Sequence, residues 1–261
     1  CLSVGAMISA GIFLLSGVAF SHIGPAIIFS YLLGGLFATF GTFSALELAT
    51  AMPQAGGVYY FTTRSLGPLA GTVSGILDWA SLSLKSAFAI YGTAQIVNQF
   101  FPSLPPVPVG IGITMFFLGV YLLSTEAAAL LQQIMVYFLL AIMVTYVGFG
   151  MLHLQVASFS PFFFNGKGIF SIFTESGFIF VSFGGLLGVI SVAEEVRDPQ
   201  RNLPIGILAS LAVVTLLYGL VIFVTVGVVP ADLLIQSHAP LADAARQQYG
   251  TLGFLVLTAG A

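Results

Sequence analysis

The sequence has very few charged residues. Of its 261 residues, 6% are Asp, Glu, Lys or Arg and 58% are hydrophobic, whereas a soluble domain carries roughly 25% charged residues. This composition excludes an ordinary water-soluble domain. Six basic and nine acidic residues, with no basic cluster among them, also give no support for nucleic acid as a partner.

Cysteine and the motifs of metal sites are equally scarce. The one cysteine is Cys1, so no disulfide can form within the chain. His22, His153 and His238 lie far apart in polar segments and have no metal-ligand spacing. We therefore expect neither a metal site nor a bound cofactor.

The motifs of intramembrane enzymes are missing as well. The sequence has no His-Glu-x-x-His, no Gly-x-Ser-x-Gly and no paired intramembrane Asp motif, so we expect no catalytic residues and no enzyme activity. The first apolar stretch has no basic flank and no small-residue cleavage site, so it does not resemble a removable signal peptide. Because residue 1 is not Met, we expect a fragment of a longer chain.

Long apolar runs dominate what is present. Each is close to the roughly 20 residues that a helix needs to cross a bilayer, and none shows the strict alternation of a membrane barrel strand. The sequence therefore predicts an all-α integral membrane protein surrounded by lipid. The predicted spans are residues 1–20, 26–50, 71–100, 108–124, 130–152, 170–194 and 205–229, with an eighth beginning near residue 251.

The basic residues of the connecting segments give a predicted orientation, because Lys and Arg concentrate in short cytoplasmic loops. With a cytoplasmic amino terminus, the inner loops hold Arg64, Arg197 and Arg201, and the outer loops hold Lys167 and Arg246. We therefore predict a multi-pass protein of the cell membrane whose amino terminus lies in the cytoplasm.

Two of the predicted spans are rich in glycine. They contain residues 5–13 (GAMISAGIF) and 180–188 (FVSFGGLLG), and each interior glycine costs a helix about 1 kcal/mol relative to alanine. Small residues also allow close helix packing, which remains an alternative for either span alone. However, Gly11 and Gly184 are 173 residues apart, and paired interrupted spans in two halves of a chain indicate a transporter site.

Several further motifs give the chain a family resemblance. They are residues 9–13 (SAGIF), 47–49 (ELA), 53–59 (PQAGGVY), 67–68 (GP), 78–79 (DW) and 193–204 (AEEVRDPQRNLP). With these motifs the chain resembles permeases of the amino acid–polyamine–organocation (APC) superfamily. The resemblance implies a leucine-transporter-like fold of two inverted five-helix repeats (5+5), with discontinuous helices 1 and 6.

The resemblance also implies how the chain is divided. Residues 1–152 would form the first repeat, with helices 1–5. Residues 153–261 would form part of the second repeat, with helices 6 and 7, an outer loop and the start of helix 8. The chain would then be a permease truncated at both ends, with about seven complete spans.

The implied activity is secondary active transport of amino acids by alternating access. At an interrupted helix, free N–H groups favour a carboxylate and free carbonyls favour an ammonium group. The resemblance places the ligand carboxylate at Ser9, Ala10 and Gly11 and the ligand ammonium at the carbonyls of Met7, Val181 and Gly184. The implied site also includes Ile8, Ser182, Phe183 and Lys85.

Lys85 lies in the middle of the third predicted span, where a lysine costs roughly 2.5–3.5 kcal/mol on insertion scales. One interpretation is functional: Lys85 lies near the ligand carboxylate or carries a proton. The other is structural: it pairs with Asp78, seven residues earlier, or extends toward the membrane surface. The sequence leaves both interpretations open.

The coupling ion and the substrate also stay open. The span 130–152 has no charged residue, although some relatives have a lysine there, so proton and sodium coupling are both possible. Leu187 stands at a position where relatives often have an acidic residue, so the sequence gives less support to a cationic substrate. Alternatives are a polyamine, organocation or other small-solute transporter, or a channel, of the same fold. A seven-helix receptor is disfavoured because it does not explain the paired glycine-rich spans.

Overall fold

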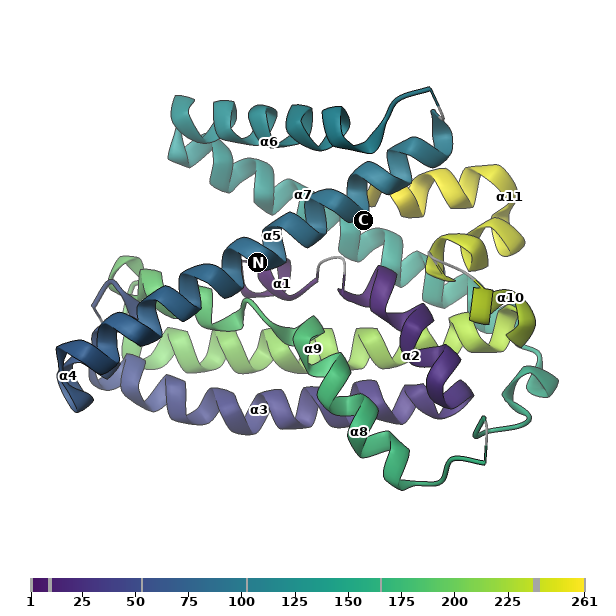
Figure 1. Cartoon of the computed structure of the whole chain (residues 1–261), viewed down its shortest axis with the longest axis horizontal. Coiled ribbons are helices and arrows are strands. Elements are labelled where there is room, and N and C mark those ends of the chain that lie inside the picture. The colour runs from purple at the N-terminus through teal and green to yellow at the C-terminus, as the bar shows by residue number, and fades with distance from the viewer. Residues whose placement is uncertain are drawn as a thin grey trace.

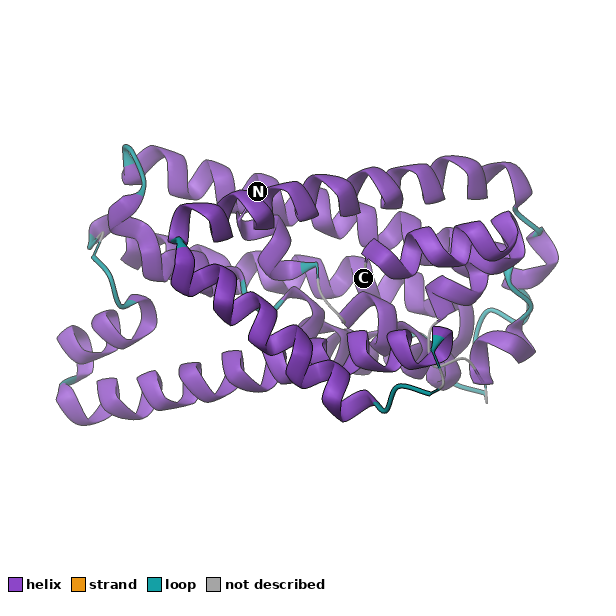
Figure 2. Cartoon of the chain, turned by 90° about the horizontal axis from the view of Figure 1, so that it is seen from above, coloured by secondary structure: helices purple, strands orange, loops and turns teal. Residues whose placement is uncertain are grey.

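The computed structural model describes residues 2–8, 11–52, 54–101, 103–164, 166–236 and 240–260, and throughout them the regular elements are helices (Figures 1 and 2). The α-helices are α1 (Leu2–Met7), α2 (Ser16–Ile23), α3 (Ile27–Ala51), α4 (Gly57–Leu66), α5 (Pro68–Phe100), α6 (Pro106–Leu123), α7 (Thr125–Gly150), α8 (Phe170–Ile179), α9 (Pro199–Val228), α10 (Ala231–Gln236) and α11 (Pro240–Gly260). Six short π- or 3₁₀-helical segments lie between them: η1 (Gly11–Leu15), η2 (Gly24–Ala26), η3 (Met151–His153), η4 (Val156–Phe159), η5 (Phe180–Phe183) and η6 (Leu186–Glu195).

The long helices begin and end within a few residues of the predicted spans. Prolines set several of the starts: α5, α6 and α9 begin at Pro68, Pro106 and Pro199. Proline is favoured at the first position of a helix because the N–H that it lacks would have no partner there anyway. The hydroxyl of Ser124 caps α7 by accepting the Ala127 N–H at 3.2 Å.

Two segments that we predicted as loops contain helices. Residues 53–68 include α4, and residues 230–250 include α10 and the first half of α11. Helices α4 and α10 have 10 and 6 residues, and α11 is kinked at Gly250, so none of them is an uninterrupted apolar run of the roughly 20 residues that predict a span. In α4, Phe61 is buried, so packing stabilises this short helix.

Helices α3 and α9 lie side by side in the lower half of the view in Figure 1. Glycine allows the close approach: a Cβ on Gly35 of α3 would collide with Thr215 of α9, and one on Gly219 would lie 2.8 Å from Leu32 Cδ2. Small residues at such contacts are typical of helices packed within a membrane. Around this pair, α1, α8, η5 and α7 complete the buried core.

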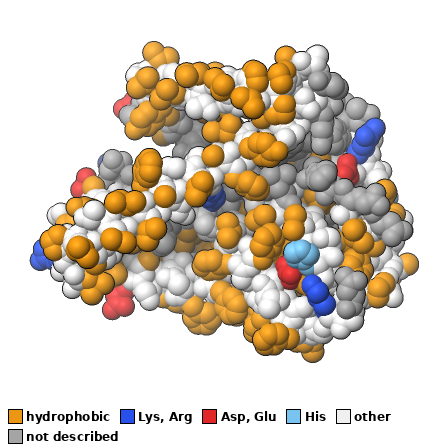
Figure 3. Space-filling view, viewed as in Figure 1, with side chains coloured by type: hydrophobic (Ala, Val, Ile, Leu, Met, Phe, Trp, Pro, Cys, Tyr) orange, Lys and Arg blue, Asp and Glu red, His pale blue; other side chains and the backbone are white. Residues whose placement is uncertain are grey.

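Helices α5 and α6 form an outer layer. None of the residues of α6 is buried, and hydrophobic side chains cover the face that α5 and α6 present in Figure 3. Charged side chains are few on that face. Such a surface is unsuited to water and suited to lipid or to other membrane helices.

Five segments of the described residues are long and apolar enough to cross a membrane: Gly11–Ala51, Pro106–Leu123, Glu126–His153, Phe170–Ser191 and Pro199–Val228. The first combines α2 and α3 in one 41-residue stretch. Helix α5 has 33 residues but is more polar and is not among the five. The predicted all-helical membrane architecture is therefore confirmed at the level of five candidate spans.

Candidate functional site

The first glycine-rich span changes conformation within the sequence-predicted site. Helix α1 ends at Met7, and Ile8 N–H still donates to the Val4 carbonyl at 2.9 Å. A π-helical turn, η1, begins at Gly11 and leads directly into α2. Two predicted site residues, Ser9 and Ala10, lie between these elements and outside the described residues.

The second glycine-rich span leaves α-helical geometry at the end of α8. After the 3₁₀ turn η5, Gly184 is extended (φ −60°, ψ 156°) and Gly185 is left-handed (φ 96°). A 3₁₀ segment, η6, then resumes at Leu186. Gly185 is needed here because a residue with a Cβ adopts a left-handed backbone only at a cost.

The two glycine-rich segments touch one another. A Cβ built on Gly11 would lie 2.8 Å from Ser182 Oγ and 2.9 Å from its Cα. A Cβ built on Gly185 would collide with the Ala6 carbonyl oxygen and lie 3.1 Å from its carbon. Glycine at both positions therefore lets the two backbones approach more closely than any other residue would allow.

Lys85 reaches this contact from the middle of α5. Its Nζ donates to the Ala6 carbonyl at 2.7 Å and also to the Gly184 carbonyl. Asp78, on the same helix, forms no ion pair with Lys85. The lysine thus joins the end of α1 to the turn after η5.

Tyr218 of α9 holds the neighbouring carbonyl. Its hydroxyl donates to the Met7 carbonyl at 3.0 Å. Its ring packs edge-on against Tyr31 of α3, with centroids 5.7 Å apart, and at a tilt against Phe183, with centroids 5.4 Å apart. All three aromatic residues are buried, so side chains of α3 and α9 line the junction between α1 and η5.

Two buried hydroxyls at this junction have unused hydrogen-bonding capacity. Ser182 and Tyr31 are almost fully buried, and their hydroxyls lie near one another. Neither makes a hydrogen bond of normal geometry among the described residues. A buried hydroxyl without a partner costs free energy, so a polar group that reached these hydroxyls would be stabilised by them.

The protein's own donors already engage the three carbonyls expected to hold a ligand ammonium. Tyr218 donates to Met7, Lys85 donates to Gly184, and the Gly184 N–H donates to Val181 at 3.0 Å. The Val181 side chain is 61% exposed, so it is the carbonyl of Val181 that takes part in the turn at Gly184. The structure therefore brings Met7, Gly11, Ser182, Phe183, Gly184 and Lys85 to one place.

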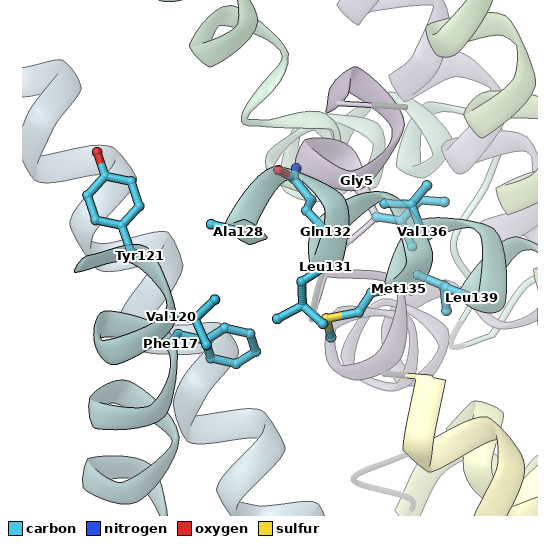
Figure 4. A pocket seen from close by; sticks show the side chains of 11 residues that line it. Gly5, Phe117, Val120, Tyr121, Ala128, Leu131, Gln132, Met135, Val136 and Leu139 are labelled. Atoms are coloured by element: carbon cyan, nitrogen blue, oxygen red, sulfur yellow. The ribbon is translucent and has the colours of Figure 1, made fainter. Parts of the chain in front are cut away.

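Ile8 contributes instead to a separate cavity of about 470 Å³ between α1, α6 and α7 (Figure 4). The lining is mostly apolar, with Gln132 and Tyr121 as its polar side chains. This cavity is distinct from the junction of the glycine-rich segments, because no other predicted site residue lines it.

Two polar contacts join distant segments of the chain to the second glycine-rich span, one near each end of that span. His22 Nδ1 of α2 lies 3.1 Å from Glu175 Oε1 of α8, and Glu175 is buried. At the other end, Glu194 Oε2 of η6 accepts the Ala55 N–H at 3.1 Å. No group of His, Cys, Asp or Glu suited to a metal ion occurs in the ranges that the structure describes.

Sequence reasoning missed Tyr31, Tyr218 and Glu175. Each carries a polar group within a predicted span, where lipid offers no hydrogen-bond partner. That position was a usable signal, because tyrosines of a membrane protein usually gather at the water interface. A hydroxyl near the middle of a predicted span identifies Tyr218 as a candidate for the site, whereas Tyr31 lies near the start of its span and is less clearly marked.

Comparison with known proteins supports the family resemblance. The family model described as "Amino acid permease" matches residues 1–260. The chain is similar to the branched-chain amino acid permease BcaP of Lactococcus lactis (30% identity, 98% of this chain and 60% of the relative). It is also similar to the vacuolar cationic amino acid transporter 2 of Arabidopsis thaliana (32%, 88% and 40%) and to the methylthioribose transporter of Bacillus subtilis (28%, 88% and 53%).

The chain spans about half the length of the curated relatives it matches. The sequence-based resemblance is confirmed, as is the expectation that the chain is not an enzyme. With its five candidate spans, the chain is part of a multi-pass membrane protein and belongs to the amino acid permease family.

Proposed function

We propose that the full-length protein containing this chain is a secondary transporter that carries amino acids across a membrane by alternating access. The family match and the names of the relatives support this function. The relatives are named for branched-chain amino acids, cationic amino acids and methylthioribose, so the family leaves the exact substrate of this protein open.

The observation that carries the proposal is the contact between α1 and the turn at Gly184 and Gly185. Both segments leave α-helical geometry near this contact, so their backbone N–H and C=O groups need partners from outside the helix in a region without water. A zwitterionic amino acid offers a carboxylate for free N–H groups and an ammonium group for free carbonyls. The unpaired hydroxyls of Ser182 and Tyr31 add polar capacity at the same place.

The finer architecture belongs to this proposal. We assign residues 1–152 to a first five-helix repeat and residues 153–261 to part of an inverted second repeat, in a leucine-transporter-like fold. Helix α5 then counts as a span: its 33 residues extend about 50 Å, more than the roughly 30 Å of a hydrocarbon core. The cytoplasmic amino terminus and the location in the cell membrane are likewise part of the proposal.

Binding and uptake by the full-length protein in proteoliposomes test the function. The panel contains the standard amino acids, with methylthioribose and putrescine to represent other small solutes of the family. Each compound is measured with and without sodium and with and without a proton gradient, because coupling is open. We expect saturable uptake of at least one amino acid. Uptake of methylthioribose or putrescine alone, or of no compound, would contradict the proposal.

A matched pair of variants links uptake to the glycine-rich segments. Gly11→Val places a side chain where Ser182 lies within 3 Å, so it should abolish amino acid binding. Gly177→Val adds the same atoms in α8, at a position with no atom within 4 Å, and should retain binding. Equal binding by the two variants would place the ligand elsewhere.

A further inference from the structure

The ammonium group of Lys85 lies on backbone carbonyls of the proposed ligand site. Its Nζ donates to Ala6, in the last turn of α1, and to Gly184, in the turn that follows η5. The last four carbonyls of a helix have no partner within that helix, so the Ala6 carbonyl is available to an external donor. The Gly184 carbonyl is one of the three at which we placed the ligand ammonium.

Lys85 is bound to these carbonyls without a nearby counter-charge. The described residues contain no ion pair of Lys85, and Asp78 on the same helix does not reach it. A charge held mainly by neutral dipoles is less stable than one paired with an opposite charge. The lysine therefore occupies the carbonyls in a way that another cation of suitable shape can replace.

A ligand ammonium cannot bind the Gly184 carbonyl with its full interaction energy while the Lys85 ammonium is bound there. Two like charges within contact distance repel each other strongly at a site with little water. An amino acid that places its ammonium on the Gly184 carbonyl must therefore move the Lys85 ammonium away from that carbonyl. The long lysine side chain has the rotamer freedom to move.

We propose that Lys85 is an internal competitor of the substrate: its ammonium occupies the ligand-ammonium position of the empty transporter and leaves when an amino acid binds. The proposal rests on the proposed function and adds to it a group that sets the affinity of the site. Each ligand ammonium has to replace the hydrogen bond from Lys85 to the Gly184 carbonyl. Lys85 also joins α1 to the turn after η5 for as long as no ligand is bound.

Chemical labelling of the wild-type protein tests this inference without a substitution. The chain has two lysines, Lys85 and Lys167, and Lys167 is exposed in a loop. Full-length protein in proteoliposomes is treated with acetic anhydride, with and without an equimolar mixture of the standard amino acids, and acetylation is followed by mass spectrometry. The amino groups of the mixture also consume the reagent, so the readout is acetylation of Lys85 relative to that of Lys167. We expect the mixture to raise this ratio, and a decreased or unchanged ratio in the presence of a binding mixture would overturn the inference.

Variants provide a second measurement. Lys85→Met removes the competitor, so the mixture should bind with a half-saturating concentration roughly tenfold lower, as expected when one charge-assisted interaction no longer has to be replaced. Lys85→Arg keeps the cation and should stay near the wild-type value, and Lys167→Met is the control for loss of a lysine. Weaker binding by Lys85→Met in protein that elutes as a single species would show that Lys85 attracts the ligand, and would refute competition.

The outcomes separate the two proposals. If the mixture neither binds to the wild type nor changes its labelling, the proposed function fails and the inference fails with it. If the mixture binds to the wild type but Lys85 responds neither to the ligand nor to substitution, the function stands and the competitor role is refuted. If Lys85→Met does not fold, the labelling of the wild type still decides.

Discussion

Gly185 offers a sharp test of the backbone contact at the centre of the proposed site. Replacing it with alanine adds one methyl group at a position where two independent costs apply. The first is conformational: φ is 96°, and a left-handed backbone costs a residue with a Cβ about 1–2 kcal/mol. The second is steric: the new carbon would lie 3.1 Å from the Ala6 carbonyl carbon and 2.8 Å from Lys85 Nζ, inside the roughly 3.5 Å of a normal contact.

Overpacking of this kind costs about 1–3 kcal/mol, so Gly185→Ala should destabilise the protein by about 2–5 kcal/mol in total. The matched control is Gly188→Ala in the same segment, since nothing lies within 4 Å of a Cβ there and its φ is not positive. Glycine-to-alanine changes at compatible positions stabilise a fold by about 0.4–1 kcal/mol.

The assay is the midpoint of thermal unfolding of the full-length protein in detergent, followed by fluorescence-detected size exclusion. We expect the midpoint of Gly185→Ala to fall well below that of the wild type, and the midpoint of Gly188→Ala to stay level or rise slightly. Equal midpoints for the two variants would refute both the left-handed turn and its contact with α1.

Three further predictions concern other contacts. Tyr218→Phe leaves the carbonyl at the end of α1 without its hydroxyl donor, so the unfolding midpoint should fall by an amount equivalent to about 1–3 kcal/mol; an unchanged midpoint would contradict this hydrogen bond. His22→Ala removes the partner of the buried carboxylate of Glu175, so it should lower the unfolding midpoint. A restored midpoint in the double variant with Glu175→Leu would show that the lower midpoint comes from the unpaired carboxylate. For the orientation, a cysteine at Lys167 should react with a membrane-impermeant maleimide in intact cells and one at Arg64 after permeabilisation; the reverse pattern would invert the topology.

The positions of the long helices could be predicted because the sequence marks them locally. An apolar run is recognisable without knowledge of its neighbours, and Pro68, Pro106 and Pro199 begin helices where the N–H that proline lacks is not needed. The short helix α4 escaped prediction because it lies between two glycines of positive φ and is too short to cross a bilayer. Its stability comes from packing, which a local pattern does not show.

The partners at the site could not be predicted, because they come from distant parts of the chain. Lys85 binds carbonyls 79 and 99 residues away, and Tyr218 binds one 211 residues away. Helical periodicity tells which residues share a face but not which helix will cover that face. The glycine-rich segments were more informative: they were predicted as helix interruptions around Gly11 and Gly184, and the structure has close backbone approaches at Gly11 and Gly185 in these segments.

Tyr218 and Lys85 both donate hydrogen bonds to carbonyls at the end of α1, but they would affect a movement of α1 away from η5 in different ways. Tyr218 joins Met7 to α9, so this hydrogen bond persists if α1 and α9 move together. Lys85 donates to both α1 and the turn after η5, so any movement that separates these two segments must break at least one of its bonds. The cost falls if another donor takes over the abandoned carbonyl, because an unpaired buried carbonyl costs more than an exchanged hydrogen bond. A ligand ammonium is such a donor, and binding at the Gly184 carbonyl would therefore ease the separation that Lys85 resists.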